Sequence, residues 1–323
     1  MRVGVVVIGR NEGERLKKCL DSVVGVDGPV VYVDSGSTDG SVEMARARGV
    51  ETLPLDSRAP FTAARARNEG FRRLRELAQD LAYVQFVDGD CEVVAHWLAK
   101  AVAFLDAKRD IAVACGRRRE RYPQRSIYNM LCDIEWDTAV GEAKACGGDA
   151  LMRIEAFEAV NGYRGELIAG EEPELCVRLR AAGWRIWRLA EEMTLHDAAI
   201  SRFGQWWKRT QRGGYAFAQG ADLHGAPPER HCVRESRSVW YWGLGFPVAI
   251  CGLTLWWGGW SLILLLAYPL QVVRLAVRGE RSVRENWWRA AFLVLGKFPE
   301  MIGQVKFILQ RYLGEQSRLI EYK

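Results

Sequence analysis

The sequence predicts an α/β domain built on a parallel sheet, followed by a helical membrane segment. Short valine-rich runs alternate with helical patterns over the first 90 residues, which is typical of parallel α/β sheets. No charged residue occurs from Val239 to Val273, a stretch too long and too apolar for most soluble cores. Arginines flank this stretch on both sides. We therefore expect an α/β domain over 1–226, a linker over 227–238, a hairpin over 239–277 and an amphipathic region over 278–323.

The expected elements follow from the spacing of apolar residues. The predicted strands are 3–8, 30–33, 52–55 and 81–87, with helices at 16–23, 42–48 and 63–77 between them. Beyond residue 91 the alternation loosens, and the predictions are helices at 97–105, 125–140 and 173–182, a strand at 111–115 and another strand before His196. Parallel α/β sheets bind ligands beyond the carboxyl ends of their strands. Polar residues directly after the strands are therefore the candidates for a binding site.

Composition narrows the class of protein. Hydrophobic residues make up 49% of the chain and charged residues 26%, which fits a globular protein. The net charge of +5 is modest and does not indicate a nucleic-acid partner. The eight cysteines are scattered without a Cys-x-x-Cys pair, so they predict neither a zinc site nor a disulfide framework, and they favour a reducing compartment. The first residues lack signal-peptide features, so we expect the α/β domain in the cytoplasm.

The first polar cluster begins with Asp34, at the end of a predicted strand, and continues through the small residues 35–40. Small turn residues allow a flat base to approach the backbone closely, and the Asp34 carboxylate can accept a hydrogen bond from the N3–H of a uracil. The alternative is an ordinary Asp/Ser/Gly turn that caps the next helix. The cluster alone does not decide between these two interpretations.

The second polar cluster is Asp88-Gly89-Asp90, directly after the predicted strand 81–87. Two carboxylates separated by one glycine can share a hard divalent cation and the diphosphate oxygens that it bridges. Mn²⁺ and Mg²⁺ both prefer oxygen ligands, so the sequence does not choose between them. An Asp-x-Asp motif alone is weak evidence for a metal site, and it becomes informative only together with the motifs around it.

Five motifs in order resemble glycosyltransferase family 2 over roughly residues 3–216. They are the runs 5–12, 33–41, 67–70 and 87–90 in the first half, and the group 147–153, 161–163 and 170–184 in the second. The resemblance implies a GT-A (Rossmann-like) fold, a nucleoside-diphosphate sugar donor with UDP-sugar favoured, a divalent metal and inversion at the anomeric carbon. The segment 206–215 matches the Gln-x-x-Arg-Trp motif of processive relatives poorly, because glycine follows Arg212, and this favours transfer of single sugars.

The resemblance also assigns roles to residues of this chain. Glu172 would be the general base, with Glu171 as its rival, because glutamate stands where the family usually has aspartate. The alternative is that both glutamates only favour a helix N-terminus. Asp90, Asp88 and His196 would hold the metal. The expected nucleotide-sugar contacts are Asn11, Glu12, Asp34, Asp39, Arg67, Asp88, Gly148, Asp149, Arg209 and Arg212. Ser35 replaces a common second aspartate of the family, which leaves the uracil contact open.

Gly258-Gly259 divides the uncharged stretch into two segments of near-spanning length, 239–257 and 260–277. Basic residues on both flanks favour a hairpin with both ends in the cytoplasm. Pro247 and Pro269 leave a re-entrant hairpin as the alternative to a spanning one. Beyond it, apolar residues from Trp288 to Tyr312 repeat at helical spacing with basic residues between them. This pattern predicts an amphipathic helix in the membrane interface, bent at Pro299.

Taken together, these features predict a metal-dependent, inverting, non-processive glycosyltransferase on the inner membrane, its catalytic domain facing the cytoplasm. The acceptor would be membrane-associated and lipid-linked, in cell-envelope polysaccharide or glycolipid assembly. One alternative is a polyprenyl-phosphate glycosyltransferase, which makes a lipid-phosphate sugar. A second is a catalytically silent membrane scaffold with a GT-A fold, against which the retained Asp88, Asp90 and Glu172 count. A homo-oligomer stays open.

Overall fold

The computed structural model describes residues 3–314 and divides into two compact units. The first, here called the sheet unit, comprises the chain up to Tyr122 together with Cys132–Ala199. The second, here called the helical unit, comprises Pro123–Leu131 and the chain from Ile200 onward. This division differs from the expected domain boundary at residue 226, because the helix that follows Ile200 packs with the C-terminal helices.

The sheet unit alternates strands and helices through its first half, as the sequence predicts. Its strands are β1 Val3–Gly9, β2 Val30–Asp34, β3 Glu51–Pro54, β4 Tyr83–Asp88, β5 Cys91–Val93, β6 Ile111–Glu120, β7 Gly141–Glu142, β8 Ala150–Arg153 and β9 Arg185–His196. Its helices are α1 Glu14–Val23, α2 Ser41–Ala47, α3 Ala63–Leu77, α4 Trp97–Ala107, α6 Ile154–Ala159 and α7 Glu171–Ala181. Helix α5, Ile127–Trp136, begins in the helical unit and ends in the sheet unit.

The sheet is mixed rather than purely parallel. Its strand order is β3-β2-β1-β4-β8-β6-β9-β5, with β7 paired to β9. Strand β1 pairs in parallel with β2 and β4, as expected, but β8 pairs antiparallel with β4, and β5 pairs antiparallel with β9. The less regular sequence beyond residue 91 therefore continues the same sheet. Parallel strands bring the ends of β1, β2 and β4 to one edge.

The core of the sheet unit explains the valine-rich runs. Val5, Val6 and Val7 are fully buried because helices cover both faces of β1, and each such side chain stabilises the fold by about 1.5–3 kcal/mol. Gly70 of α3 lies so close to β1 and β2 that a Cβ there would stand 2.4 Å from Val6 Cγ1. This close approach sets the position of Arg67, one turn earlier on the same face of the helix.

Two predicted elements end four or five residues away from their predicted ends. The strand predicted at 111–115 continues to Glu120 as β6, although Arg117, Arg118 and Arg119 look unfavourable for a buried strand. Arg117 and Arg118 are half-buried and Arg119 is exposed, and each forms an ion pair with an acidic residue of the sheet unit, which offsets the cost of partial burial. The helix predicted at 125–140 is shorter and ends at Trp136.

The helical unit consists of helices alone among its described residues. They are η1 Pro123–Arg125, α8 Phe203–His224, α9 Val233–Trp240, η2 Tyr241–Gly245, α10 Phe246–Trp257, η3 Gly258–Leu266, α11 Ala267–Val277, α12 Val283–Leu295 and α13 Lys297–Leu313, together with the start of α5. Helices α8 and α13 pack with their backbones in contact. A Cβ at Gly214 would stand 2.0 Å from the carbonyl oxygen of Glu300, and one at Gly303 would stand 2.0 Å from that of Gln211.

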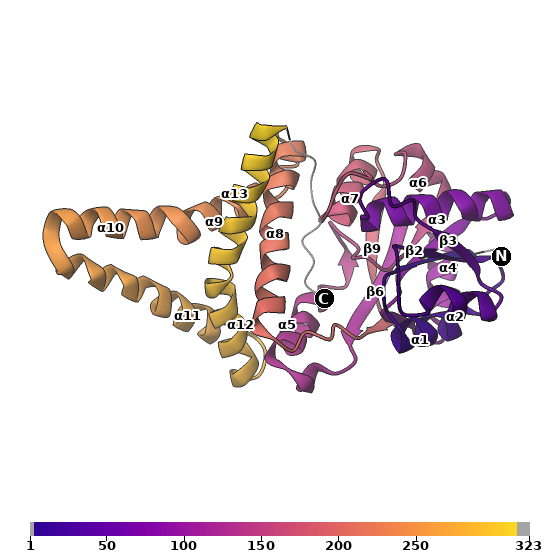
Figure 1. Cartoon of the computed structure of the whole chain (residues 1–323), viewed down its shortest axis with the longest axis horizontal. Coiled ribbons are helices and arrows are strands. Elements are labelled where there is room, and N and C mark those ends of the chain that lie inside the picture. Colours follow the sequence, from indigo (N-terminus) through magenta and orange to yellow (C-terminus); the bar gives the residue numbers. More distant parts are fainter. Residues whose placement is uncertain (1–2, 315–323) are drawn as a thin grey trace. The chain divides into compact units, whose positions relative to one another are not determined.

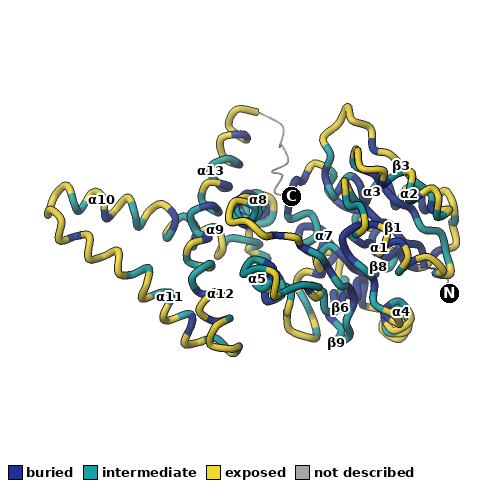
Figure 2. Tube along the Cα trace, turned by 60° about the horizontal axis from the view of Figure 1, so that its bottom comes forward, coloured by how far each residue is buried: buried dark blue, intermediate teal, exposed yellow. Residues whose placement is uncertain are grey.

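The uncharged stretch forms a helical hairpin that projects from the rest of the helical unit. The chain runs outward along α10, reverses at Gly258, whose φ is +74°, and returns along α11 (Figure 1). The segment 233–277 is long and apolar enough to cross a membrane, because its most apolar 18 residues have a mean hydropathy of 1.7 and only 11% of them are buried. Figure 2 shows the exposed positions along both arms. At the tip Trp256, Trp257 and Trp260 are 83%, 66% and 87% exposed.

The amphipathic region forms two helices instead of one bent helix. The interruption falls at Gly296, between α12 and α13, three residues before the bend predicted at Pro299. Pro299 is the third residue of α13, in the first turn, where backbone N–H groups have no partner within the helix and proline is tolerated. The part of the expected amphipathic region at 315–323 lies outside the described residues.

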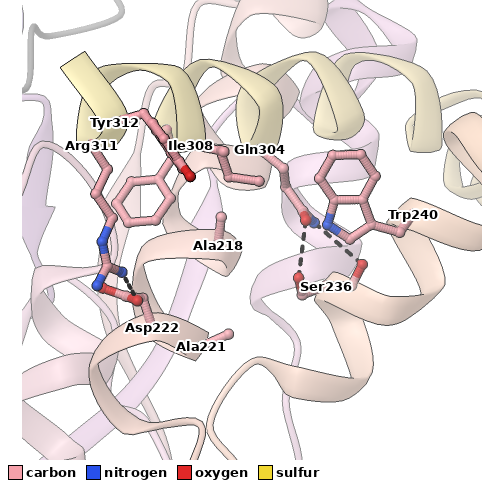
Figure 3. A pocket seen from close by; sticks show the side chains of 10 residues that line it. Ala218, Ala221, Asp222, Ser236, Trp240, Gln304, Ile308, Arg311 and Tyr312 are labelled. Carbon is pink, nitrogen blue, oxygen red and sulfur yellow. Dashed lines mark hydrogen bonds and ion pairs between the residues drawn. The ribbon is translucent and has the colours of Figure 1, made fainter.

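A cavity of about 610 Å³ lies among α8, α9 and α13 (Figure 3). Ala218, Phe307 and Ile308 supply apolar walls. One end carries a hydrogen bond of 2.9 Å from Ser236 Oγ to Gln304 Oε1, and the other carries the ion pair of Arg311 with Asp222. The cavity belongs entirely to the helical unit.

Candidate active site

The loops after β1 and β2 are tied together by hydrogen bonds. The backbone N–H of Thr38 donates to Asn11 Oδ1 over 2.7 Å, and the N–H of Asn11 donates to Ser37 Oγ over 2.9 Å. The N–H of Gly13 donates to Asp39 Oδ2 over 3.0 Å. Asn11 has a φ of +54°, a left-handed conformation that asparagine tolerates better than most residues. The predicted residues Asn11, Asp34 and Asp39 therefore belong to one loop cluster at the end of the parallel strands.

The carboxylate of Asp34 organises the turn that follows it. Its Oδ2 accepts from the backbone N–H groups of Gly36 and Ser37, both over 2.9 Å, and its Oδ1 accepts from the hydroxyl of Tyr32 over 3.0 Å. Asp34 is buried. Asp34 thus stabilises the turn after β2, as one of the two interpretations of the sequence expects. Its contact with the uracil of a nucleotide stays a prediction.

Glu12 and Asp39 are held at the edge of the same loop cluster. Glu12 forms an ion pair of 2.8 Å with Arg15. The Asp39 carboxylate also accepts from Ser41, at the start of α2, over 2.6 Å from the hydroxyl. The small burial of Asp39 works to raise its pKa, but the hydrogen bonds from Ser41 and Gly13 outweigh it and lower the pKa. Asp39 is therefore charged at neutral pH and stabilises the start of α2.

Alternating charges connect the acidic pair to the Asp-Gly-Asp turn. Glu171 Oε1 lies 2.8 Å from Arg67 Nη1, and Arg67 Nη2 lies 2.7 Å from Asp88 Oδ1. Arg118 Nη2 lies 2.7 Å from the other oxygen of Asp88, and Arg118 Nε lies 3.1 Å from Asp149 Oδ2. Five residues far apart in sequence thus form one row of charges of alternating sign, which we call the charge row.

The charge row depends on close approach by the Gly147-Gly148 turn. A Cβ at Gly148 would stand 2.9 Å from both Arg67 Nη2 and Asp88 Oδ2, so a larger residue there would displace this ion pair. Next to it, the buried Asp149 accepts from the backbone N–H of Asp88 over 2.9 Å and from Thr194 Oγ1 over 2.8 Å. Gly148 and Asp149 therefore shape the turn around Asp88.

Arg118 is the residue of this site that sequence reasoning missed. It is half-buried, it contacts two of the carboxylates, and its guanidinium lies 5.1 Å from the ring centroid of Trp136. Burial works to raise the pKa of Asp88, but Arg67 and Arg118 outweigh it and lower that pKa. The run of three arginines at 117–119 was the only signal in the sequence, and it lay beyond the predicted end of the strand.

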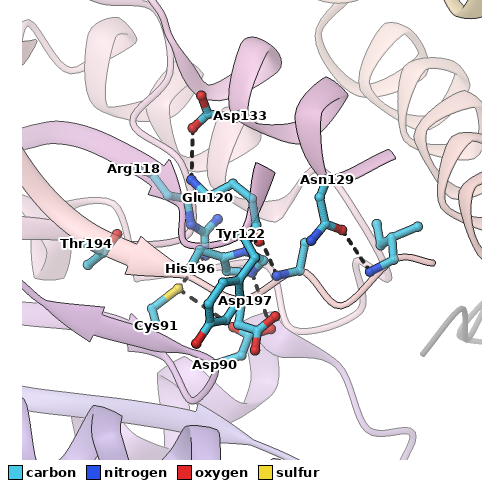
Figure 4. Close-up of polar contacts among 12 residues, drawn as sticks. Asp90, Cys91, Arg118, Glu120, Tyr122, Asn129, Asp133, Thr194, His196 and Asp197 are labelled. Atoms are coloured by element: carbon cyan, nitrogen blue, oxygen red, sulfur yellow. Dashed lines mark hydrogen bonds and ion pairs between the residues drawn. The ribbon is translucent and has the colours of Figure 1, made fainter. Parts of the chain in front are cut away.

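Asp90 and His196 form a second polar group beside the charge row (Figure 4). His196 Nε2 lies 3.3 Å from Asp90 Oδ2, and its Nδ1 lies 3.5 Å from Glu120 Oε2. All three residues are buried, and the ring of Trp136 packs edge-on against His196 with centroids 4.5 Å apart. Cross-strand pairing of Cys91 with His196 brings the ends of β5 and β9 together.

The donor atoms of this group fit a divalent cation. Ligand atoms of Asp90, Cys91 and His196 lie within 4.8 Å of one another, and carboxylate with imidazole suits Mn²⁺. The Nδ1 of His196 has no hydrogen bond in the described residues, although it is buried. Both oxygens of Asp88 are engaged by arginines, so Asp90 and His196 are better placed as metal ligands than Asp88.

Glu172 lies at the start of α7, next to Glu171. Its Oε1 accepts from the backbone N–H groups of Cys146 and Gly147, over 2.6 and 2.7 Å. Burial raises the pKa of Glu172 and the neighbouring charge of Glu171 adds to it, while the two backbone hydrogen bonds oppose the rise. A carboxylate with a raised pKa is the better proton acceptor. Glu171 is instead committed to Arg67, which favours Glu172 as the base.

Arg209 and Arg212 lie on α8 in the helical unit, and both are half-buried. The other predicted site residues lie in the sheet unit. A role of either arginine toward a diphosphate therefore stays a prediction.

Known proteins resemble this chain in sequence and in structure. Residues 4–157 match the family model "Glycosyl transferase family 2". Succinoglycan biosynthesis protein ExoA of Rhizobium meliloti is 32% identical over 184 residues, which cover 53% of this chain and 54% of that protein. Glycosyltransferase AglE of Haloferax volcanii is 25% identical over 227 residues, which cover 66% of this chain and 71% of that protein. The chain thus matches only about half the length of ExoA.

Among solved structures, a mannosyltransferase from Pyrobaculum calidifontis, in complex with GDP-Man and Mn²⁺, is similar with a TM-score of 0.60. It is 19% identical, and the match covers 96% of this chain and 88% of that one. This likeness confirms the predicted GT-A fold. The fold, the order of the motifs and the matched model together support the expected assignment of residues 4–157 to glycosyltransferase family 2.

Proposed function

We propose that this protein is an inverting, metal-dependent glycosyltransferase that moves one sugar from a nucleoside-diphosphate donor to a lipid-linked acceptor at a membrane. We favour a UDP-sugar and a role in cell-envelope polysaccharide or glycolipid assembly. Relatives named for glycosyl transfer and for succinoglycan biosynthesis support the reaction class. The apolar segment 233–277 supports the membrane.

The observation that carries the proposal is the placement of Glu172. Its carboxylate has a pKa raised by burial, and the charge row links its neighbour Glu171 through Arg67 to Asp88. The acidic pair and the Asp-Gly-Asp turn thus form one connected site, although 80 residues separate them in the chain. A helix cap alone would not require that connection.

In the proposed reaction, Glu172 takes the proton of the acceptor hydroxyl as that oxygen attacks the anomeric carbon. The bond from the anomeric carbon to the diphosphate breaks, and the nucleoside diphosphate leaves. Asp90 and His196 would hold the Mn²⁺ or Mg²⁺ ion, which when bound stabilises the charge that develops on the diphosphate. Arg67 and Arg118 hold Asp88 ionised beside this position.

The hairpin would keep the site at the bilayer. A lipid acceptor then diffuses in two dimensions while the soluble donor arrives from the cytoplasm. Residues 239–257 in helical form extend about 28 Å, close to the ~30 Å hydrocarbon core. The exposed tryptophans at the tip would then lie at the far interface, where tryptophan is enriched. We therefore favour a spanning hairpin over a re-entrant one.

The test is a donor and acceptor screen with the full-length protein in lipid nanodiscs. Release of nucleoside diphosphate from a panel of nucleotide sugars is measured with Mn²⁺ or Mg²⁺, first with polyprenyl phosphate and then with sugar-bearing polyprenyl lipids. Turnover that requires a sugar-bearing lipid supports the proposal. Turnover with polyprenyl phosphate alone identifies the polyprenyl-phosphate glycosyltransferase instead, and the absence of donor binding favours the silent scaffold.

A further inference from the structure

Two cysteines that the proposed reaction does not use lie beside Glu172. Cys146 belongs to the loop before β8, and Cys176 lies one turn after Glu172 on α7. Their sulfur atoms are 3.6 Å apart, and both side chains are buried. Ligand atoms of Cys146, Glu172 and Cys176 all lie within 4.8 Å of one another. Thirty residues separate the two cysteines in sequence, so their spacing along the chain gave no sign of this cluster.

The geometry of the cluster matches a soft metal rather than a hard one. Two sulfurs that each lie about 2.3 Å from a tetrahedral zinc ion are about 3.8 Å apart. The observed separation of 3.6 Å is close to that value without any movement of the backbone. Thiolates select Zn²⁺ over Mn²⁺ and Mg²⁺, which prefer oxygen.

The third ligand and an access path are also present. Glu172 accepts both of its backbone hydrogen bonds at Oε1, so Oε2 is the carboxylate oxygen that would bind a metal. The loop around Cys146 has no regular secondary structure from Ala143 to Asp149, and Lys144, Ala145 and Gly147 are exposed. An ion can therefore reach the sulfurs by a small displacement of this loop.

We propose that Cys146, Cys176 and Glu172 form a zinc site, separate from the Asp90–His196 group, and that zinc bound there inhibits sugar transfer. Binding displaces the two thiol protons to solvent and engages the Glu172 carboxylate. A carboxylate held by zinc no longer accepts the proton of an acceptor hydroxyl. The inhibition rests on the proposed role of Glu172 as the base, whereas the binding of zinc does not.

The binding test uses full-length protein with its thiols kept reduced, ZnCl₂ and a chromophoric chelator as competitor. Cys146→Ala and Cys176→Ala should each weaken zinc binding at least about 100-fold, since even the loss of a residue that only supports a ligand costs 10- to 100-fold. Asp90→Asn should bind zinc as the unchanged protein does. Cys132→Ala, another buried cysteine in the sheet unit, serves as the matched control and should also bind normally.

Co²⁺ gives a second readout, because cobalt bound to thiolates has charge-transfer absorption that a carboxylate–imidazole site lacks. This absorption should appear in the unchanged protein and in Asp90→Asn and disappear in Cys146→Ala. Loss of zinc binding in Asp90→Asn with retention in both cysteine variants would overturn the site. Thermal unfolding of each variant shows whether it is folded.

Transfer assays at saturating Mn²⁺ test the consequence. Zinc should inhibit the unchanged protein, and Cys176→Ala should need at least about tenfold more zinc for half-inhibition. Zinc that binds at the cysteines without slowing transfer would keep the site and overturn the role of Glu172 as base. If no nucleotide sugar is turned over at all, the proposed function is wrong. The zinc-binding data still show whether the zinc site exists.

Discussion

The sheet unit and the helical unit place their charges in opposite ways. In the sheet unit, Arg67 and Asp149 are buried and Arg118 is half-buried beside them, and each is matched by a partner of opposite sign. In the helical unit, the segment 239–273 has no charge at all, and its flanking arginines are exposed. In the sheet unit, the proposed catalytic function depends on a few charged atoms. In the helical unit, the proposed membrane binding is distributed over many apolar side chains.

This difference has a consequence for mutation. Removing one member of a buried charge group leaves its partner uncompensated, so a single substitution has a large effect. An exposed apolar surface does not depend on any single residue, because each side chain contributes a similar small free energy when it is buried. Substitutions in the sheet unit should therefore change activity or stability by orders of magnitude, and single substitutions in the helical unit should not.

The largest effect is expected at Asp90. Asp90→Ala removes a proposed metal ligand and should lower the rate of sugar transfer at least about 10³-fold, the equivalent of about 4 kcal/mol. EDTA should have the same effect on the unchanged protein, and Mn²⁺ or Mg²⁺ should restore activity. The rate of nucleoside-diphosphate release is the measurement. Full activity after thorough removal of metal would contradict the metal role.

The next effect concerns stability at Arg118. Arg118→Met leaves the buried Asp149 and the half-buried Asp88 without this guanidinium and should lower the free energy of unfolding by about 3–5 kcal/mol. Arg119 is the matched control, because it lies next in β6 and pairs with Glu192 at the surface. Arg119→Met should cost about 0–1 kcal/mol. Urea unfolding followed by tryptophan fluorescence measures both, and equal costs would show that burial of the pair is unimportant.

Glu172 should have a smaller and purely kinetic effect. Glu172→Gln keeps the size of the side chain and removes its ability to accept a proton, so transfer should fall by about 10² or more while donor binding survives. Single-turnover rates and donor affinity measured by titration separate the two. If Glu171→Gln shows this behaviour instead, the base is Glu171. If neither variant does, the acidic pair only favours the start of α7.

The pH dependence of transfer gives a further check on Glu172. The base acts in its deprotonated form, so activity is lost as the pH falls through its pKa. Because burial raises that pKa, the acidic limb should lie above the range of a solvated glutamate, which titrates near 4.3. A rate profile between pH 4 and 8 measures the limb. A limb at the ordinary value would show that the base is solvated.

Much of the sheet unit could be predicted because its signals are local. Helix α3 has the predicted bounds, and β1 and β2 each extend one residue beyond theirs. The order of motifs also named Asp90, Glu172 and Asp149. Arg118 could not be predicted, because three arginines in a strand look exposed until the acidic residues that match them are in place. The cluster of Cys146 and Cys176 depends on a loop meeting a helix, which no sequence spacing encodes.

The helical unit could be predicted only in outline. Composition identified the uncharged stretch and its turn at Gly258, because lack of charge and a glycine pair are visible without tertiary contacts. The position of the break between α12 and α13 could not be predicted from composition. Pro299 was the expected interruption, and the two helices divide three residues before it, at Gly296, since Pro299 has no N–H to donate to the carbonyl of Leu295.

The smallest effect is expected at the arginines beside the hairpin. Arg278 is exposed just after α11, and Arg278→Gln should weaken binding to anionic lipid by only about 1 kcal/mol, the contribution of one basic residue near a charged surface. The protein should stay with the membrane fraction after an alkaline carbonate wash. The wash strips proteins held by charge and leaves inserted ones behind. Immunoblots of the pellet and the supernatant measure the distribution.

The control for this prediction is Arg58→Gln, which removes an equally exposed charge from the sheet unit and should leave membrane binding unchanged. A chain that ends near Ala226 lacks the hairpin and should move largely to the supernatant, because the apolar arms that would insert are gone. Release of the protein from the membrane by Arg278→Gln alone would contradict the contrast between the two units. Release would mean that charge, not apolar burial, holds the helical unit at the membrane. The exposed tryptophans at the hairpin tip would then serve another purpose.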